Sequence, residues 1–137
     1  LELIKELQEE FGMALMYISH DLAVVGQMAD EIMVMYMGMV MEHASTDGIF
    51  DDPLHPYTVA LWRSIPKIEG KLEKLHSISG TLPSPYAYIP GCPFFSRCER
   101  RMGGVCDASL PPLVEVKPGH EVRCFLYGTP GATKSES

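Results

Sequence analysis

The sequence predicts an α/β fold in the first half of the chain and an irregular, cysteine- and proline-rich extension in the second half. In residues 1–66, apolar side chains at helical spacing alternate with short apolar runs, which is the pattern of helices packed against strands. After Gly80 the composition changes, because eight of the 11 prolines and all four cysteines lie beyond it. We expect such a segment to form turns, and to need a metal or a neighbouring surface to hold it.

The opening of the chain is predicted to be an amphipathic helix followed by a buried strand. The apolar face of the helix consists of Leu1, Ile4, Leu7 and Phe11. Gly12 is placed to end this helix, and the apolar run at residues 13–19 predicts a parallel strand. Because the polar residues His20 and Asp21 follow at once, we expect the carboxyl end of the strand to reach solvent there. Since the chain begins within the predicted helix, we expect it to be a truncated or proteolysed part of a longer protein.

Residues 21–66 are predicted to continue this alternation of helices and strands. The expected elements are a helix over residues 21–29, strands over 32–36 and 39–43, a short helix after residue 45, and a helix over 56–65. Asp21 can cap the first of these helices, and Gly38 can form the turn between the strands. Pro53 stops the short helix, and Pro56 lies in the first turn of the last helix, where its missing N–H does no harm.

Methionines occupy every second position from residue 33 to residue 41. Soft thioether groups can bind copper, so a metal-binding motif is one interpretation of Met33, Met35, Met37, Met39 and Met41. One face of a buried pair of strands explains the same spacing without a ligand, and we favour that interpretation.

Composition and charge exclude several classes of protein. With 46% hydrophobic residues, the 137-residue chain can bury a core. Its net charge of -7 and the lack of a basic run argue against binding nucleic acid. The longest apolar stretch, residues 32–41, is about half of the roughly 20 residues that a membrane-spanning helix needs. The first residues also lack the features of a secretory signal, so we expect a cytoplasmic protein that reaches membranes only through partners.

His20 is the first candidate site residue. An imidazole between a predicted strand and a predicted helix suits an anionic group such as a phosphate, although a plain loop histidine is the simpler interpretation of His20 alone. The order of elements over residues 1–38, with Ser19-His20-Asp21 between strand and helix, resembles the closing portion of an ABC-transporter nucleotide-binding domain. The resemblance implies that His20 is the catalytic switch residue, which contacts the γ-phosphate of bound ATP and helps to position the attacking water. Phosphoryl transfer depends mainly on such positioning and charge stabilisation.

A second motif narrows the family. Gly48-Ile49-Phe50, residues 53–58 (Pro-Leu-His-Pro-Tyr-Thr) and Leu61 resemble a stretch that is typical of oligopeptide and dipeptide importer ATPases. Within it, we interpret His55 and Tyr57 as capping and packing residues rather than catalytic ones. The motif therefore identifies a subfamily without adding chemistry.

The third block carries the candidate metal ligands, Cys92, Cys98, Cys106 and Cys124. Their C-x5-C-x7-C-x17-C spacing lacks the C-x2-C pairs of most structural zinc sites, whereas four thiolates are the usual complement for an iron–sulfur cluster. With residues 80–98, these cysteines resemble the C-terminal extension of the same subfamily, which implies a [4Fe-4S] cluster where the site is intact. Zinc, disulfides and free buried thiols stay open as alternatives, and a reducing cytosol argues against native disulfides.

Several ATPase motifs are absent from the sequence. A phosphate-binding loop needs G-x-x-x-x-G-K-S/T, and the single Gly-Lys pair, Gly70-Lys71, is followed by Leu72. The Leu-Ser-Gly-Gly-Gln motif and the Walker B strand with its catalytic glutamate are also missing. In the family these elements precede the part that this chain resembles. We therefore expect the full-length subunit, with ATP and Mg, to be a transport ATPase, and this chain alone to bind ATP weakly and to be inactive.

The predicted organisation has four segments. Residues 1–66 form the C-terminal part of an ABC nucleotide-binding domain, 67–79 a linker, 80–128 the cysteine-rich oligopeptide-transporter extension, and 129–137 a disordered tail. The resemblance implies, as partners, a second ABC ATPase subunit, two transmembrane permease subunits and, indirectly, a peptide-binding protein, at the inner face of the cell membrane. An open sheet edge and an uncovered helix face also predict that this chain self-associates.

The function predicted from these features is that of part of an ATPase subunit, which couples ATP hydrolysis to the import of oligopeptides or dipeptides across the cytoplasmic membrane. The alternative is a free-standing iron–sulfur or metal-binding interaction module, whose functional part would be the cysteine-rich end. A small hydrolase built on His20 and Asp21 is disfavoured, because no recognisable motif places a serine or cysteine nucleophile nearby.

Overall fold

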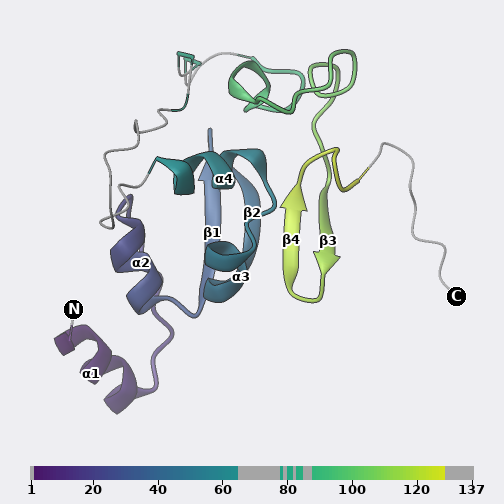
Figure 1. The fold of residues 1–137 in the computed structure, drawn as a ribbon. Helices are drawn as coiled ribbons and strands as arrows, with labels where there is room; N and C mark the ends of the chain where they lie inside the picture. Colours follow the sequence, from purple (N-terminus) through teal and green to yellow (C-terminus); the bar gives the residue numbers. More distant parts are fainter. Residues whose placement is uncertain (1, 65–77, 79, 82, 85–87, 129–137) are drawn as a thin grey trace, which may run out of the picture.

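A computed structural model describes residues 2–64, 78, 80–81, 83–84 and 88–128 (Figure 1). The elements are, in chain order, α1 (Glu2–Phe11), α2 (Leu22–Met28), β1 (Glu31–Tyr36), β2 (Met39–Ser45), α3 (Thr46–Asp51), α4 (Pro56–Arg63), the 3-10 helix η1 (Phe95–Arg97), β3 (Leu113–Lys117) and β4 (His120–Arg123). Within these residues the strands form one antiparallel sheet in the order β1-β2-β4-β3. Helices α3 and α4 lie over one face of β1 and β2, so the α/β class is confirmed.

Local sequence signals set the helix boundaries as predicted. The Asp21 side chain accepts hydrogen bonds from the backbone N–H groups of Ala23 and Val24, at 3.0 and 3.3 Å, and so caps α2. Helix α1 ends at Phe11, and Gly12 follows it with a φ of 60°, a conformation that glycine adopts without strain. These predictions are confirmed, as are the short helix after residue 45 and the last helix from Pro56.

The β1–β2 hairpin contains both a tight turn and a bulge. Met37 and Gly38 have positive φ angles of 50° and 76°, which suits the two-residue turn of a twisted hairpin. The pairing register shifts near the middle of β1, where β2 contributes one extra residue. Because of this bulge, Met41 and its neighbour Glu42 are both fully buried instead of facing opposite sides of the sheet.

The methionine interpretation is wrong for β1. Burial alternates along the strand, with Ile32, Val34 and Tyr36 on the buried face. Met33 and Met35 lie on the opposite face, with 61% and 55% of their surfaces exposed. Branched and aromatic side chains take the face that α3 and α4 cover, and the thioether side chains are left on the open face.

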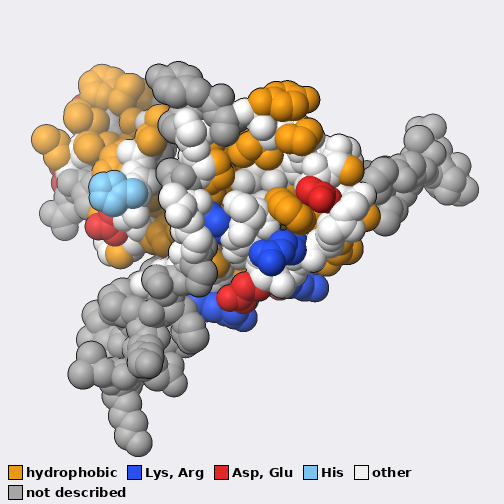
Figure 2. Space-filling view, turned by 90° about the horizontal axis from the view of Figure 1, so that it is seen from above, with side chains coloured by type: hydrophobic (Ala, Val, Ile, Leu, Met, Phe, Trp, Pro, Cys, Tyr) orange, Lys and Arg blue, Asp and Glu red, His pale blue; other side chains and the backbone are white. Residues whose placement is uncertain are grey.

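The strand predicted over residues 13–19 does not form. These residues are irregular, and Ile18 is 91% exposed. A strand satisfies its backbone N–H and C=O groups by pairing, and the described residues place no strand beside this segment (Figure 1). The apolar side chains of α1 and of residues 13–18 consequently gather in solvent on the side of the molecule seen at the upper left of Figure 2.

The hairpin of β3 and β4 joins the cysteine-rich extension to the sheet. Strand β4 pairs with β2 through Glu42 opposite Val122 and His43 opposite Glu121. Neither strand was predicted from the sequence, because both are short and lie among prolines, which disfavour strands and outweigh the alternating valines of this region. The first half of the chain and the extension therefore share one sheet.

Two predicted segments lie largely outside the described residues. The linker, residues 67–79, is described only at Ile78, and the tail, residues 129–137, lies wholly outside the described ranges. Among the helices of the described part, none combines the length and apolar character needed to cross a bilayer.

Two hydrophobic clusters stabilise the fold. The first lies between the sheet and the helices α3 and α4 and contains Ile32, Val34, Ala44 and Ile49. The second lies where the end of β1 meets the extension and contains Tyr36, Met41, Cys92, Phe94, Cys98, Cys106 and Phe125. Within it, Tyr36 packs edge-on against Tyr57 of α4 and Phe94 of the extension, with ring centroids 4.8 and 5.4 Å apart. Each such pair adds about 0.5–1.5 kcal/mol beyond the area it buries, so the second cluster binds α4 to the extension.

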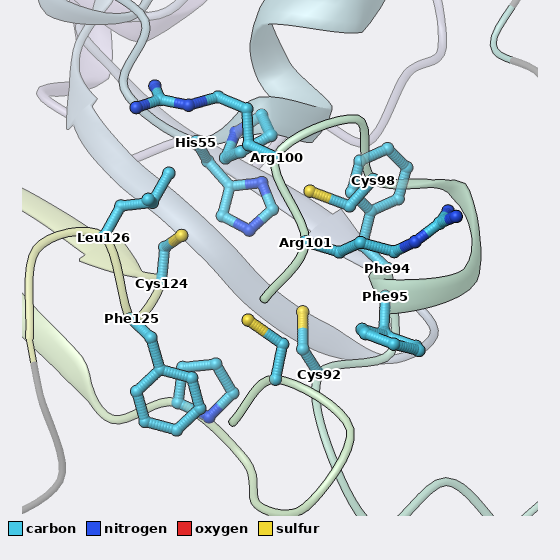
Figure 3. Close-up of a pocket in the computed structure, with 13 residues that line it drawn as sticks. His55, Cys92, Phe94, Phe95, Cys98, Arg100, Arg101, Cys124, Phe125 and Leu126 are labelled. Carbon is cyan, nitrogen blue, oxygen red and sulfur yellow. The ribbon is translucent and has the colours of Figure 1, made fainter. Parts of the chain in front are cut away.

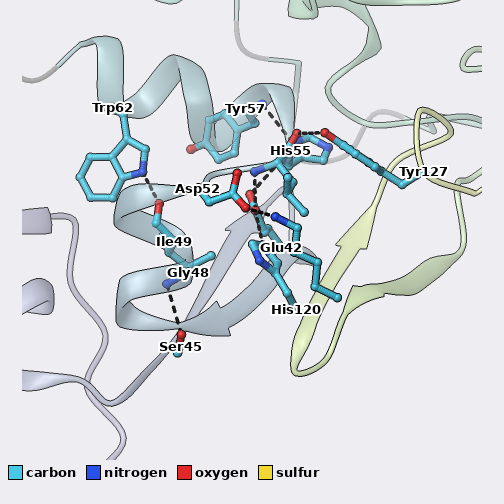
Figure 4. Close-up of polar contacts among 12 residues, drawn as sticks. Glu42, Ser45, Gly48, Ile49, Asp52, His55, Tyr57, Trp62, His120 and Tyr127 are labelled. Carbon is cyan, nitrogen blue, oxygen red and sulfur yellow. Dashed lines mark hydrogen bonds and ion pairs between the residues drawn. The ribbon is translucent and has the colours of Figure 1, made fainter.

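Glu42 connects three segments from a fully buried position (Figure 4). One carboxyl oxygen, Oε1, accepts a hydrogen bond from the Leu54 N–H at 2.7 Å and lies 2.7 Å from Nε2 of the buried His120. The other oxygen, Oε2, accepts the His55 N–H at 3.0 Å. This carboxyl group on β2 thereby holds both the loop before α4 and the hairpin strand β4 in place.

We expect Glu42→Ala to lower the free energy of unfolding by about 3 kcal/mol or more, because two backbone N–H groups and a buried imidazole lose their acceptor. Urea denaturation followed by circular dichroism measures this change. Glu99→Ala is the matched control, since the Glu99 side chain is 87% exposed beside Arg63 and its loss should change stability by less than about 0.5 kcal/mol. Equal unfolding free energies for the two variants would contradict the role given to Glu42.

Candidate functional site

The four cysteines, all buried and with free thiols, line a single pocket (Figure 3). The remaining walls are mostly apolar side chains, including Phe94 and Phe125, together with His55, Arg100 and Arg101. Apolar groups therefore surround the sulfur atoms, and two guanidinium groups supply positive charge nearby.

Each cysteine is held by a local feature of the backbone. Cys92 precedes η1, and its N–H donates to the carbonyl of Cys106 at 2.7 Å. Cys98 ends η1, with its N–H bonded to the Phe95 carbonyl at 3.2 Å. Cys124 follows β4 directly, so the sheet positions it. The structure thus brings together all four predicted metal ligands.

Gly91 allows the Cys92 and Cys106 segments to approach each other. A Cβ atom at this position would lie 2.2 Å from the Cys106 carbonyl oxygen and 2.7 Å from the Asp107 carbonyl carbon. No side chain fits there, because both contacts are backbone atoms that cannot move aside. A glycine before the first cysteine is therefore a packing requirement of the pocket.

Burial keeps thiols of the pocket protonated. It raises the pKa of Cys92 to about 11, and the neighbouring thiols Cys124, Cys98 and Cys106 add to that increase. Burial is also the main cause of the raised pKa values of Cys98 and Cys124, while the charge of Arg100 acts in the opposite direction. A positive charge beside a sulfur atom would favour its thiolate form in this pocket.

The described residues of the pocket are not arranged as a preformed metal site. Among the described residues, no three His, Cys, Asp or Glu side chains are placed to hold one metal ion together. The donor set is nevertheless four thiols in an apolar pocket, and thiolates are ligands for soft metals and iron–sulfur clusters.

His55 joins the pocket to helix α4. Its Nδ1 atom accepts the Tyr57 N–H at 3.0 Å and caps the helix, which confirms the capping interpretation. The residue is 1% exposed, and its Nε2 atom has no hydrogen-bond partner. Burial lowers the pKa of His55 to about 4, against a smaller opposing effect of the Arg123 carbonyl, so the ring is neutral near pH 7. No signal in the sequence places His55 beside the cysteines, because a long stretch of chain separates them.

His20 is exposed and does not line the cysteine pocket. It precedes Asp21, the cap of α2, so its predicted place before a helix is confirmed. Its predicted place at the end of a strand is wrong, because residues 13–19 find no neighbouring strand with which to pair. The histidine and the cysteine pocket are therefore two separate candidate sites.

An α/β unit joined through one sheet to a four-cysteine extension is the arrangement expected for the C-terminal part of a peptide transporter's ATP-binding subunit. The family described as the oligopeptide/dipeptide transporter, C-terminal region, matches residues 41–106. This chain belongs to the ATP-binding proteins of oligopeptide and dipeptide ABC transporters and corresponds to their C-terminal portion.

Curated relatives extend the match over almost the whole chain. The chain is 46% identical over 135 residues to the oligopeptide transport ATP-binding protein AppD of Bacillus subtilis (strain 168), in a match that covers 98% of this chain and 41% of the relative. It is 43% identical over 127 residues to the dipeptide transport ATP-binding protein DppF of Escherichia coli (strain K12), covering 91% of this chain and 37% of the relative. The chain thus spans about two fifths of the length of these relatives. Neither relative is named as a free-standing metal-binding module.

In the metal-free chain, Cys92 should react with iodoacetamide near pH 8 about a hundredfold more slowly than an exposed cysteine of ordinary pKa. Raising the pKa from 9.0 to about 11 lowers the fraction of reactive thiolate by that factor, and burial slows the reaction further. Mass spectrometry after timed alkylation measures the rate, with the urea-unfolded chain as the control. A folded-chain rate equal to the unfolded rate is incompatible with the buried position of Cys92.

Proposed function

We propose that this chain is part of an ATPase subunit that couples ATP hydrolysis to the import of oligopeptides or dipeptides across the cytoplasmic membrane. The observation that carries the proposal is the similarity, over 98% of the chain, to a protein named as an oligopeptide transport ATP-binding protein. The full-length subunit would bind ATP and Mg through a phosphate-binding loop and a Walker B strand outside the residues of this chain. The family match supports the proposal further, because residues 41–106 run from β2 into the cysteine-rich extension.

In this function His20 would be the catalytic switch residue. Its exposed position leaves the imidazole accessible to a phosphate group. In the full-length subunit, strands from the remaining residues would pair with the apolar segment 13–19 and cover its side chains. His20 would then lie at a sheet edge, where an N–H donated to a γ-phosphate oxygen stabilises charge as water attacks and the bond between the β- and γ-phosphates breaks.

A second ABC ATPase subunit, two transmembrane permease subunits and, indirectly, a peptide-binding protein would complete the importer. The proposed location is the cytoplasmic face of the cell membrane, where the permeases would hold the ATPase subunits peripherally. Exposed apolar side chains on α1, such as Leu3 and Phe11 at 65% exposure, supply surface for the rest of the subunit. The same surface would drive self-association of the isolated chain.

We also propose that Cys92, Cys98, Cys106 and Cys124 bind a [4Fe-4S] cluster. The proposal is supported by thiols that are free and buried and that line one pocket. When bound, such a cluster supplies iron–thiolate bonds and a site for one electron. The chain contributes the sulfur ligands, apolar walls that exclude water, and two arginines whose charge offsets that of the thiolates. These ligands would tie together an extension that is rich in proline and poor in regular structure.

Replacing His20 with alanine in the full-length subunit should lower the rate constant of ATP hydrolysis about 100- to 1,000-fold while ATP still binds, because one stabilising donor at the transferring phosphate is lost. A phosphate-release assay and nucleotide titration calorimetry measure the two quantities. His43→Gln is the control, since His43 pairs with Glu121 on the sheet and its loss should leave hydrolysis unchanged. Full activity of the His20→Ala subunit would remove His20 from the mechanism.

After anaerobic reconstitution with iron and sulfide, the chain should hold about four iron and about four sulfide ions per molecule. Replacing all four cysteines with serine should abolish this uptake, because the thiolate ligands are lost. Colorimetric iron and sulfide analysis measures the content, and Ser109→Ala, at an exposed position outside the pocket, is the control. Binding of one zinc ion in place of iron would contradict the cluster.

A further inference from the structure

The feature of the pocket that the proposed cluster does not explain is the buried nitrogen Nε2 of His55. The residue is 1% exposed and lines the pocket with the four cysteines, yet this nitrogen has no hydrogen-bond partner. Figure 3 shows the ring pointing into the pocket from the side of α4. A buried polar atom without a partner destabilises a fold, and such atoms are rare. A bound group that brings a hydrogen-bond acceptor to Nε2 would account for this unpaired nitrogen.

The geometry at the start of α4 assigns the proton of the ring. Nδ1 accepts the Tyr57 N–H at 3.0 Å, so in a neutral imidazole the proton is on Nε2. The main-chain N–H of His55 donates to Glu42, and Pro56 restricts the backbone that follows. The ring also packs near Phe94, with 6.1 Å between centroids. The Nε2–H group is consequently a donor that is held in one direction.

Among the described residues that line the pocket, only one kind of side chain can accept this hydrogen bond. Arg100 and Arg101 are donors, and the other lining side chains apart from the cysteines are apolar. The Arg123 carbonyl interacts with the ring enough to oppose the effect of burial on the pKa of His55, but Nε2 has no partner that meets the geometry of a hydrogen bond. Among these side chains, the sulfur atoms are the acceptors that are left. A thiol accepts weakly, whereas a metal-bound thiolate or sulfide carries the negative charge that strengthens the bond.

We propose that the Nε2–H group of His55 donates a hydrogen bond to a sulfur atom of the metal-bound pocket, which makes His55 a positioning residue of the iron–sulfur site. The inference rests on the proposed cluster. A hydrogen bond to sulfur withdraws electron density, so it favours the more negative, reduced state. If the pocket holds a cluster, one electron from dithionite would reduce it while no covalent bond to His55 forms or breaks and the proton stays on Nε2. The His-Pro-Tyr motif at residues 55–57 thereby links the start of α4 to the reduction potential of the iron–sulfur site.

His55→Asn tests the inference while it keeps the cap of α4. The asparagine side-chain oxygen can still accept the Tyr57 N–H, but the shorter side chain withdraws the N–H donor from the pocket. In the anaerobically reconstituted chain we expect unchanged iron and sulfide content. We also expect a more negative midpoint potential, with the equilibrium constant for reduction about tenfold lower, which is about 59 mV for one electron. Thr58→Val is the matched control and should leave the potential unchanged, because Thr58 Oγ1 is also buried without a partner but Thr58 does not line the pocket.

A measurement on the unsubstituted chain keeps the test decisive if the variant fails to fold. Pulsed EPR of the dithionite-reduced protein, with nitrogen-15-labelled histidine, should show a weak coupling to nitrogen that disappears in His55→Asn. Either an unchanged potential in a folded, iron-loaded variant or the absence of this coupling overturns the role of His55 and leaves the cluster standing. An unsubstituted chain that takes up no iron overturns the cluster and the role of His55 together.

Discussion

Glu42, a fully buried carboxyl group, holds this fold together at its centre. A bulge in the β1–β2 hairpin turns Glu42 inward beside Met41, where water does not reach it. There it accepts hydrogen bonds from the loop that precedes α4 and contacts His120 of β4. A buried polar group without hydrogen-bond partners lowers the free energy of unfolding. Each partner of Glu42 is therefore needed as much as the carboxyl group itself. The first half of the chain and the extension are consequently folded around a shared polar centre.

The cysteine pocket takes its geometry from the same centre. Cys124 follows β4, whose pairing with β2 occurs at Glu42 itself. His55 is bonded to Glu42 through its main chain and presents its ring to the pocket. Tyr36 of β1 packs on Phe94 of the extension, with ring centroids 5.4 Å apart. Whatever the pocket binds is therefore coupled mechanically to the sheet and to α4, the elements that connect the extension with the rest of the chain.

Signals that act between near neighbours are sufficient to predict the helices. Asp21 begins α2 and Gly12 follows the end of α1, as expected. Both effects, a side-chain cap and a glycine with positive φ, depend only on backbone groups within about four residues. Strands depend on distant partners. The apolar run at residues 13–19 has no partner among the described residues, whereas a hairpin forms among the prolines of the extension because β2 offers it an edge. The methionines of β1 were also misinterpreted because the decisive contacts are distant. A period of two shows that the side chains share one face of the strand, but it does not indicate which face other elements will cover.

Residue types and their local spacing were enough to recognise the family and to predict the caps of the helices. They also singled out four cysteines and His20 as the residues with distinctive chemistry. The folded arrangement was needed to show that the cysteines meet in one pocket, that His55 turns its ring toward them, and that His20 stays in solvent. Burial and side-chain direction arise from contacts between segments far apart along the chain, and a pattern read over a few neighbouring residues carries no information about such contacts.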